Sequence, residues 1–241
     1  MRPSAPHGRI VTMNKILITG ASSGIGAALA VKLAARGTAL ALAGRSQEKL
    51  EALGIEGATL LSGDLTSAGV AETTVNSANE ALGGLDVVVH SAGIGLIKSS
   101  LETTDAEFTK VLNVNTRATF LVAQASAKLM AAQKQGLFIT IPGILGKAPM
   151  KNAAAYCASK YAVTGLIKCF AQEFARSGVR FSLFHLGGVD SPFWDDLGTS
   201  FQRDKMIPVE TAADLVLQAI DAPPGLVLSE VVMQPESHQL V

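Results

Sequence analysis

Residues 15–26 read KILITGASSGIG, and this stretch predicts the fold. Its first six residues are an apolar run typical of a buried parallel strand, and a helical pattern follows it. Between the two, Gly20, Gly24 and Gly26 allow a tight turn, a close approach of the backbone to a phosphate, and close packing of helix on strand. In this context the pattern predicts a dinucleotide site at the helix N-terminus. A plain glycine-rich turn is the alternative interpretation.

The rest of the chain repeats this alternation of short apolar runs and longer helical patterns. We expect strands at KILITG, ALALAG, ATLLS, DVVVHSAG, LFITIP, RFSLFH and LVLSEVVM, and helices at about 24–36, 46–53, 67–82, 105–135, 152–176 and 209–221. Such alternation predicts stacked βαβ units. The expected fold is therefore α/β, a single doubly wound Rossmann domain with a seven-stranded parallel sheet, helices on both faces and strand order 3-2-1-4-5-6-7.

Composition narrows the class of protein. Of the 241 residues 48% are hydrophobic and 17% charged, with 20 basic and 20 acidic side chains, so we expect neither disorder nor a nucleic-acid partner. No apolar run approaches the roughly 18 residues that would span a bilayer. Cys157 and Cys169 fall on one expected helix, about 18 Å apart and too far for a disulfide. We therefore expect a soluble, cytoplasmic protein.

Two segments stand outside the alternation. Residues 1–13 lack the apolar core of a secretory signal, and we interpret them as a loose N-terminal tail before a domain at 14–241. Residues 187–207 form one long irregular segment, which in a compact domain is more often functional than idle. We interpret it as a substrate lid, in which Phe193 and Trp194 either hold an apolar substrate or seat the lid. The four histidines are widely separated along the sequence, so no metal site is expected.

The end of the second expected strand discriminates between NAD and NADP. NAD sites usually place an acidic residue there for the ribose 2′-hydroxyl, whereas this chain has Gly44, Arg45 and Ser46. The planar guanidinium of Arg45 suits a 2′-phosphate, so we expect NADP(H) in preference to NAD(H), with a solvated arginine as the alternative. Asp64, after the third strand, is placed to bind the adenine or else caps the next helix.

Three motifs in order along the chain carry a family likeness, namely TGASSGIG at 19–26, HSAG at 90–93 and YCASK at 156–160. With them, nearly all of residues 14–235 resemble the short-chain dehydrogenase/reductase family. The resemblance implies an NADP(H)-dependent oxidoreductase that interconverts a carbonyl and a secondary alcohol of a small-molecule substrate. It also implies a homodimer or homotetramer through the helices at 105–135 and 152–176. The implied cofactor-binding residues are Gly20, Ser22, Ser23, Gly24, Ile25, Gly26, Arg45, Asp64, Leu65, Ala92, Gly93, Tyr156, Lys160, Gly187 and Val189.

The YCASK motif supplies acid/base chemistry. Tyr156 and Lys160 are four residues apart on an expected helix and share a face. A free phenol has a pKa of about 10, and a nearby ammonium favours the phenolate, so we expect Lys160 to lower the pKa of Tyr156. Tyr156 would then exchange a proton with the substrate oxygen. In the family Lys160 also binds the nicotinamide ribose. A packed tyrosine beside a solvated lysine is the alternative.

Two further positions follow from the resemblance. Asn115 aligns with the family's active-site asparagine, which bends its helix and holds a water in the proton relay; Asn113 is the competing choice. The family's catalytic serine, which hydrogen-bonds the substrate carbonyl, falls on Gly143. Loss of such a donor costs on the order of 10²–10³ in rate. Candidates to replace it are Thr140, Ser91, the Gly143 N–H and a water.

Other departures from the family cluster around the same pocket. His90 and Ser91 replace the two asparagines of an NNAG-like motif, and Leu186 replaces the proline before Gly187. His185 either faces the substrate or is a satisfied histidine at a strand end, and we favour the second interpretation. The expected substrate residues are Gly143, Ser91 and Trp194. Because the serine is missing, a non-catalytic NADP(H)-binding homologue is the main rival, and an epimerase or dehydratase that uses bound cofactor is a third interpretation.

Overall fold

The computed structural model describes residues 13–195, 197, 202–237 and 239. Its centre is a parallel seven-stranded sheet in the order β3-β2-β1-β4-β5-β6-β9. The strands are β1 Lys15–Thr19, β2 Ala39–Gly44, β3 Thr59–Ser62, β4 Val87–His90, β5 Gly136–Thr140, β6 Val179–Leu186 and β9 Glu230–Met233. The expected fold class and strand order are confirmed. All but residue 13 of the expected tail, and residues 196 and 198–201 of the expected lid, lie outside the described residues.

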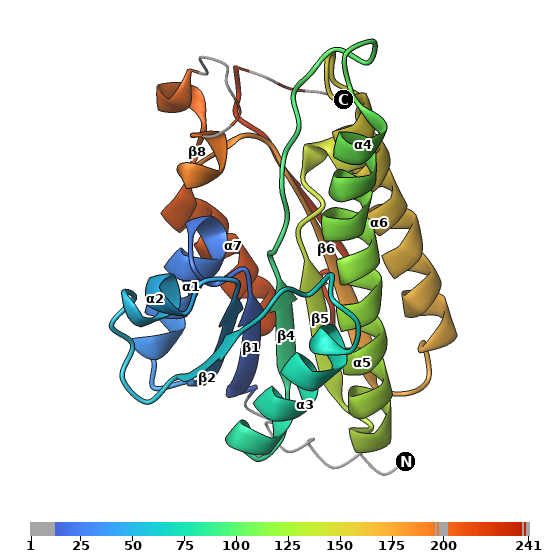
Figure 1. Ribbon diagram of the computed structural model, residues 1–241. Coiled ribbons are helices and arrows are strands. Elements are labelled where there is room, and N and C mark those ends of the chain that lie inside the picture. Colours follow the sequence, from blue (N-terminus) through green and yellow to red (C-terminus); the bar gives the residue numbers. More distant parts are fainter. Residues whose placement is uncertain (1–12, 196, 198–201, 238, 240–241) are drawn as a thin grey trace, which may run out of the picture.

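Helices cover both faces of the sheet (Figure 1). One face carries α1 Gly24–Ala34, α2 Gln47–Glu51 and α7 Val209–Ile220, and the other carries α3 Val70–Leu82, α5 Ala118–Gln133 and α6 Ala154–Glu173. Alternate strand residues serve the two layers, because side chains along a strand point to opposite faces. In β1, Ile16 and Ile18 pack toward α1 and α7, whereas Leu17 packs on the opposite side. Two apolar cores therefore enclose the sheet.

The helix expected at 105–135 is not regular. It consists of α4 Asp105–Leu112, a π-helical turn at Asn113–Arg117, and α5. Thr104 and Glu107 form a capping box at the start of α4. A π turn holds one more residue than an α turn, so the side chains inside it point in different directions from those of a regular helix. Such turns are frequent at functional sites.

The last strand is shorter than expected, since only Glu230–Met233 of the predicted run LVLSEVVM pairs with β6. The Gly187 N–H donates to the Met233 carbonyl at 2.8 Å and extends this pairing into the lid. The base of the lid is closed by a small parallel pair, β7 Val189–Asp190 and β8 Ile207–Pro208. None of the described helices combines the length and hydropathy that crossing a bilayer would need.

Candidate active site

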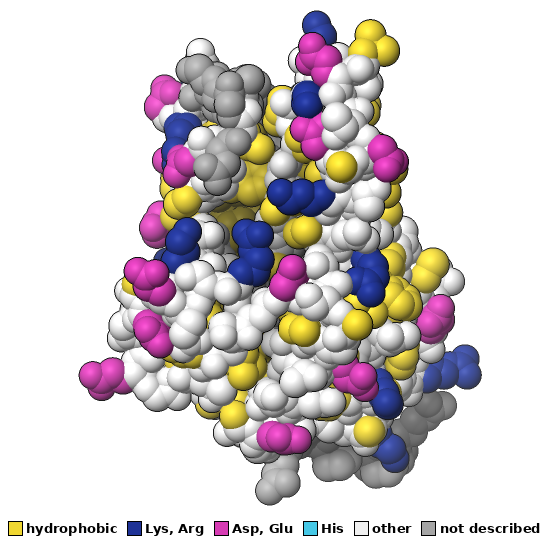
Figure 2. All heavy atoms as spheres, viewed as in Figure 1, with side chains coloured by type: hydrophobic (Ala, Val, Ile, Leu, Met, Phe, Trp, Pro, Cys, Tyr) yellow, Lys and Arg dark blue, Asp and Glu magenta, His cyan; other side chains and the backbone are white. Residues whose placement is uncertain are grey.

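A single large cleft opens at the carboxyl ends of the strands, where parallel α/β sheets place their ligands. Its volume of about 2310 Å³ exceeds the roughly 300–1,000 Å³ of an ordinary small-molecule site and leaves room for a dinucleotide and a second ligand. Figure 2 shows the hollow, with hydrophobic side chains inside it and Lys and Arg side chains around its lower edge. Every site residue predicted from the sequence lines this cleft except Asn115, which lies buried behind it.

The glycine turn forms one end of the cleft. Gly20 has φ +71°, and a Cβ there would lie 2.6 Å from the Ala92 nitrogen. A Cβ on Gly26 would lie 2.4 Å from the Gly20 oxygen, so the helix rests directly on the turn. Ser23 precedes α1 and makes no side-chain cap bond. The first N–H groups of the helix therefore keep their capacity to bind an anion, and the turn fits a pyrophosphate.

The two cations Arg45 and Lys49 line the cleft beyond this turn, and both side chains are exposed. Within the described part of the chain no hydrogen bond or ion pair engages Arg45. Lys49 was not predicted, although its spacing of four from Arg45 at the start of α2 could have indicated it. Asp64 accepts from the Thr66 N–H at 2.9 Å and the Thr66 hydroxyl at 2.8 Å, and these bonds lower the pKa of its carboxyl. Asp64 thus orders its own turn while it lines the cleft.

Tyr156 and Lys160 lie one turn apart on α6. Lys160 Nζ is 5.6 Å from the centre of the Tyr156 ring and 3.4 Å from the Ile141 carbonyl oxygen. Burial raises the pKa of the Tyr156 hydroxyl and lowers the pKa of Lys160 to about 8. The direction at Tyr156 is opposite to our expectation, because burial disfavours the charged phenolate and the neighbouring Cys157 adds to this effect. At neutral pH Tyr156 is a neutral phenol, able to donate a proton.

Asn115 lies in the π turn and is 1% exposed. Its amide donates to the Ile94 carbonyl and the Ser159 hydroxyl, both at 2.9 Å, and its oxygen accepts from the Ile94 N–H at 2.8 Å. The side chain therefore ties the loop after β4 to the helix that carries Tyr156. Asn113, the competing choice, lines the cleft itself.

Gly143 has φ +72° in the loop after β5. Three of the predicted substitutes for the missing serine donate their hydrogens elsewhere. The Gly143 N–H donates to the Phe184 carbonyl at 3.2 Å, the Thr140 hydroxyl to the His90 carbonyl at 3.1 Å, and the Ser91 hydroxyl to the Thr19 carbonyl at 2.8 Å. The expectation that one of them replaces the serine finds no support in this arrangement.

Two histidines are buried behind the cleft. The Thr19 hydroxyl lies 2.7 Å from His90 Nδ1, and burial lowers the pKa of His90 to about 3, so the ring is neutral. His185 is fully buried on β6, as favoured from the sequence. Its Nδ1 lies 3.1 Å from the Gly143 carbonyl oxygen, and its Nε2 lies 3.1 Å from a Glu230 carboxylate oxygen. Among the described residues no group of histidines, cysteines and acids could hold a metal ion.

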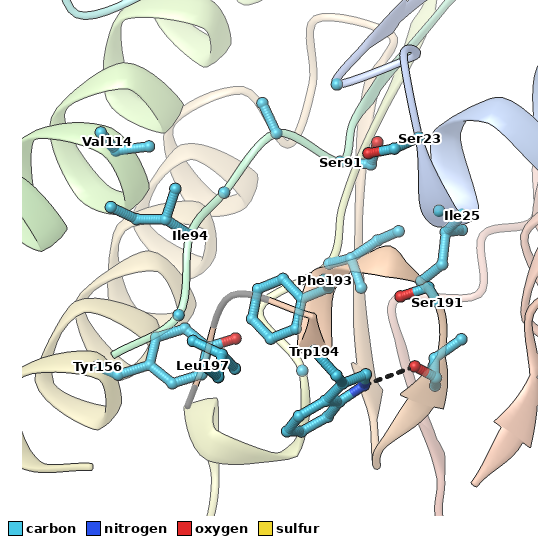
Figure 3. Close-up of a pocket in the computed structure, with 18 of the residues that line it drawn as sticks. Ser23, Ile25, Ser91, Ile94, Val114, Tyr156, Ser191, Phe193, Trp194 and Leu197 are labelled. Carbon is cyan, nitrogen blue, oxygen red and sulfur yellow. Dashed lines mark hydrogen bonds between the residues drawn. The ribbon is translucent and has the colours of Figure 1, made fainter. Parts of the chain in front are cut away.

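The lid brings aromatic side chains over Tyr156 (Figure 3). The Phe193 ring lies 6.0 Å from the Tyr156 ring, and Trp194 meets Phe193 edge-on at 5.4 Å. Trp194 Nε1 donates to the Val189 carbonyl at 2.7 Å, which seats the indole. Sequence reasoning missed Ile97, Met150 and Pro235, which also line the cleft. They come from segments distant in the sequence, and no local pattern marks them.

Comparison with known proteins places this geometry in a family. The short chain dehydrogenase family model matches residues 14–200. The chain is 34% identical over 206 residues to a short-chain dehydrogenase/reductase of Armillaria gallica, covering 81% of this chain and 77% of that protein. It is 30% identical over 222 residues to an uncharacterized oxidoreductase of Staphylococcus epidermidis, covering 91% and 96% respectively.

Solved structures agree. An alcohol dehydrogenase from Thermococcus sibiricus, complexed with 5-hydroxy-NADP, gives a TM-score of 0.85 at 26% identity and covers 94% of this chain and 99% of that one. A metagenomic short-chain oxidoreductase in complex with NADP gives 0.79 at 31% identity, with coverage of 92% and 97%. The chain belongs to the short-chain dehydrogenase/reductase family. It is an oxidoreductase of this type.

Proposed function

We propose that the protein is an NADP(H)-dependent oxidoreductase that interconverts a carbonyl and a secondary alcohol, with Tyr156 as the acid/base. The observation that carries this proposal is one continuous cleft, lined by the glycine turn at one end, by Arg45 and Lys49 beyond it, and by Tyr156 beside Lys160. The two NADP-bound relatives support the choice of cofactor. We also propose that residues 187–207 act as the substrate lid.

The residues of the cleft fit this cofactor. The N-terminus of α1 would hold the pyrophosphate, and Arg45 with Lys49 would hold the 2′-phosphate. When bound, the reduced cofactor supplies a hydride, so that a carbonyl compound, NADPH and one proton give the alcohol and NADP⁺.

Tyr156 gives its phenolic proton to the carbonyl oxygen during reduction and takes one back during oxidation. Lys160, with a pKa of about 8, carries a positive charge at neutral pH and stabilises the transient phenolate. Asn115 acts at a distance from the substrate, by fixing the loop at Ile94 to Ser159 of the helix that carries Tyr156.

A Tyr156→Phe substitution tests the mechanism, since it removes the proton donor and keeps the ring. We expect NADPH consumption with a panel of carbonyl compounds to fall by about 10²-fold or more, while NADPH binding is kept. The matched control is Tyr161→Phe, which removes the chain's other phenol. The Tyr161 side chain is exposed, and its hydroxyl donates to the Lys147 carbonyl oxygen. Unchanged turnover in Tyr156→Phe would show that the assigned mechanism is wrong.

A non-catalytic NADP(H)-binding protein is the second candidate, and one observation favours it. Gly143 stands at the family's serine position, and the neighbouring donors Thr140 and Ser91 are already engaged. The same carbonyl panel separates the two candidates, because a protein that only binds the cofactor consumes no NADPH.

A further inference from the structure

We propose that the substrate is a neutral carbonyl compound with an apolar body and an electron-poor carbonyl group, as in an aromatic 2-keto ester. This inference rests on the proposed function and concerns the same cleft. Two features carry it, namely the composition of the wall around Tyr156 and the number of groups there that can donate a hydrogen bond to a carbonyl oxygen.

The wall around Tyr156 consists of hydrocarbon and aromatic side chains from three segments, the loops after β4 and β5 and the lid. We call it the apolar wall, and its members are Ile94, Ile97, Ile144, Leu145, Met150, Phe193, Trp194 and Leu197. The view in Figure 3 shows Phe193 and Leu197 beside Tyr156, with Trp194 next to Phe193. Binding the apolar part of a ligand against such a surface is favoured by roughly 25 cal/mol for each Å² of apolar area removed from water.

The side chains of the apolar wall offer a ligand almost no hydrogen-bonding groups. The one side-chain N–H in it, Trp194 Nε1, donates to the Val189 carbonyl. The wall also closes tightly on itself, since a Cβ on Gly95 would lie 2.7 Å from the Phe193 ring and 3.0 Å from Leu197. A carboxylate or phosphate placed here would lose its hydration without a partner, which is costly.

Charged side chains also line the cleft, and two of them, Asp195 and Lys205, belong to the lid. The charged side chains are Arg45, Lys49, Asp64, Asp105, Lys110, Lys160, Asp195 and Lys205. Asp195 pairs with Arg203 at 2.6 Å, and Lys205 is exposed near the end of the lid. Lys160 Nζ lies 3.4 Å from the Ile141 carbonyl oxygen and 3.3 Å from where a Gly93 Cβ would be. None of them is a member of the apolar wall, so an acidic substrate lacks a counterion there.

No described member of the apolar wall has a side-chain hydroxyl, and Tyr156, which packs beside it, supplies the hydrogen-bond donor. The Ser191 hydroxyl lies instead toward the glycine turn, 3.6 Å from where a Gly24 Cβ would be. A single donor gives less stabilisation to the oxygen charge that develops during reduction, and a missing donor costs on the order of 10²–10³ in rate. An electron-withdrawing substituent on the substrate's carbonyl, such as an ester group, itself stabilises part of that developing charge. The site therefore suits activated carbonyls better than simple ketones.

Binding can be measured without turnover, because Trp194 is the only tryptophan and belongs to the apolar wall. Its emission is followed while the unmodified protein is titrated with ethyl mandelate or with mandelate, two alcohols that differ by ester against carboxylate. We expect the ester to bind at least about tenfold more tightly. Equal or tighter binding of mandelate would overturn the assignment of a neutral substrate.

Variants locate the ligand. Phe193→Ala should weaken binding of ethyl mandelate by about 2- to 12-fold, the range of one aromatic contact. Phe108→Ala, at a half-exposed phenylalanine outside the lining of the cleft, should leave it unchanged. Met150→Lys adds a cation to the apolar wall and should improve mandelate binding. If Phe193→Ala binds the ester as the unmodified protein does, the ligand does not lie on this wall; the comparison of ester and acid stands even if a variant fails to fold.

Reduction of three phenyl ketones by NADPH tests whether the site prefers an electron-poor carbonyl group. Ethyl benzoylformate should be reduced to its hydroxy ester at least about 10²-fold faster than acetophenone, which lacks the ester, and faster than benzoylformate, which is an anion. Comparable rates for acetophenone and the keto ester would refute the need for an activated carbonyl. If ethyl mandelate binds at Trp194 and none of the three is reduced, the neutral ligand class holds and the proposed oxidoreductase activity fails.

Discussion

Gly143 shows how one residue limits the chemistry of the cleft. Its φ of +72° and ψ of 175° belong to a region that is essentially restricted to glycine and costs other residues on the order of 1–3 kcal/mol. Its carbonyl oxygen faces His185 Nδ1, and its N–H is bonded to Phe184, so the backbone is held from both sides. A Cβ would nevertheless find room, because the nearest atom, the Leu186 oxygen, would be 3.4 Å away. Conformation, more than space, opposes a side chain here.

Replacing Gly143 by serine should restore a donor to the site. We predict that Gly143→Ser lowers the free energy of unfolding by about 1–3 kcal/mol, because its backbone conformation suits only glycine, and raises or preserves carbonyl reduction, by up to about 150-fold if the hydroxyl reaches the substrate. The matched control is Gly143→Ala, which has the same strain and no hydroxyl. Chemical denaturation and NADPH consumption measure the two effects.

The comparison between Gly143→Ser and Gly143→Ala shows whether a hydroxyl at this position acts on the substrate. Equal rates in the serine and alanine variants would mean that a hydroxyl at this position cannot reach the substrate. A stable Gly143→Ser protein that binds NADPH but reduces nothing on a broad carbonyl panel would favour the non-catalytic candidate.

Arg45 should govern the choice between the two dinucleotides. We predict that NADPH binds more tightly than NADH and that Arg45→Ala erodes this preference by about 10- to 150-fold, the range of a charge-assisted hydrogen bond. Arg36→Ala is the control, since Arg36 is paired with Asp221 and does not line the cleft. Calorimetric titration of both nucleotides measures the effect, and equal affinities in the unmodified protein would contradict it.

At the scale of single residues, the sequence predicted those members of the site that belong to a local motif. TGASSGIG and YCASK keep their members close in the chain, so their meeting in one cleft was predictable. Of the apolar wall, Phe193 and Trp194 were named from the sequence, whereas Ile97 and Met150 were not, because they come from two other loops and no local pattern marks them. The pKa of Tyr156 also escaped prediction, since its direction depends on how completely the fold removes water from the phenol.

At the scale of elements, the strand order was predictable because βαβ units wind in a regular way. The apolar pattern does not predict the π turn at Asn113–Arg117, because it runs through the turn without a break, although the family resemblance implied that Asn115 bends its helix. The length of β9 was overestimated because Val227 and Val232 are 40% and 49% exposed. A run of valines at the edge of a sheet looks in sequence like a buried strand, although one side of it faces solvent.

Glu230 ties the edge strand β9 to its neighbours. It pairs with Lys147 at 2.8 Å and Lys168 at 3.3 Å and faces His185. The bond with Lys147 is the first of the causes that lower the pKa of Glu230 from 4.5 to about 2. A lowered pKa in the folded state stabilises the protein above pH 4.5, and this stabilisation is lost as the pH falls from there through about 2.

We therefore predict that Glu230→Gln lowers the free energy of unfolding near pH 7 by about 1 kcal/mol or less, because the group is partly exposed. The difference from the unmodified protein should shrink as the pH falls from 4.5 toward 2. Urea unfolding over that range measures it, with Glu56→Gln, at an exposed residue of a surface turn, as the control. A difference that stays constant with pH would rule out the ion pairs as its source.

At the scale of the whole molecule, the cleft lies between the lid on one side and α4 and α6 on the other. The outer faces of the helices on that second side carry apolar side chains. Phe108 on α4, Phe120 on α5 and Tyr161 on α6 are 41%, 38% and 43% exposed. Exposed aromatic groups on adjacent helices are typical of an interface between proteins. This supports the homodimer or homotetramer that the family resemblance implied.

Light scattering should accordingly give two or four times the chain mass of 24.9 kDa. Phe120→Glu, which would bury a charge in such an interface, should shift the mass toward that of one chain. Leu101→Glu is the control, because Leu101 is 98% exposed in a loop. A single-chain mass for the unmodified protein would contradict the prediction.

The place of β9 in the sheet also sets an order of assembly. Strands β1 to β6 come from residues 15–186, whereas β9 begins at Glu230, and this later strand holds Gly187 through Met233 and contacts His185 beneath Gly143. As the chain leaves the ribosome, the inner strands can pair while β9 is still unmade. A translation product that stops before residue 230 contains the glycine turn and Tyr156 but lacks the bond from Gly187 to Met233 and the contact of Glu230 with His185. Interrupted synthesis should thus yield a chain that retains much of its sheet and has an incomplete site.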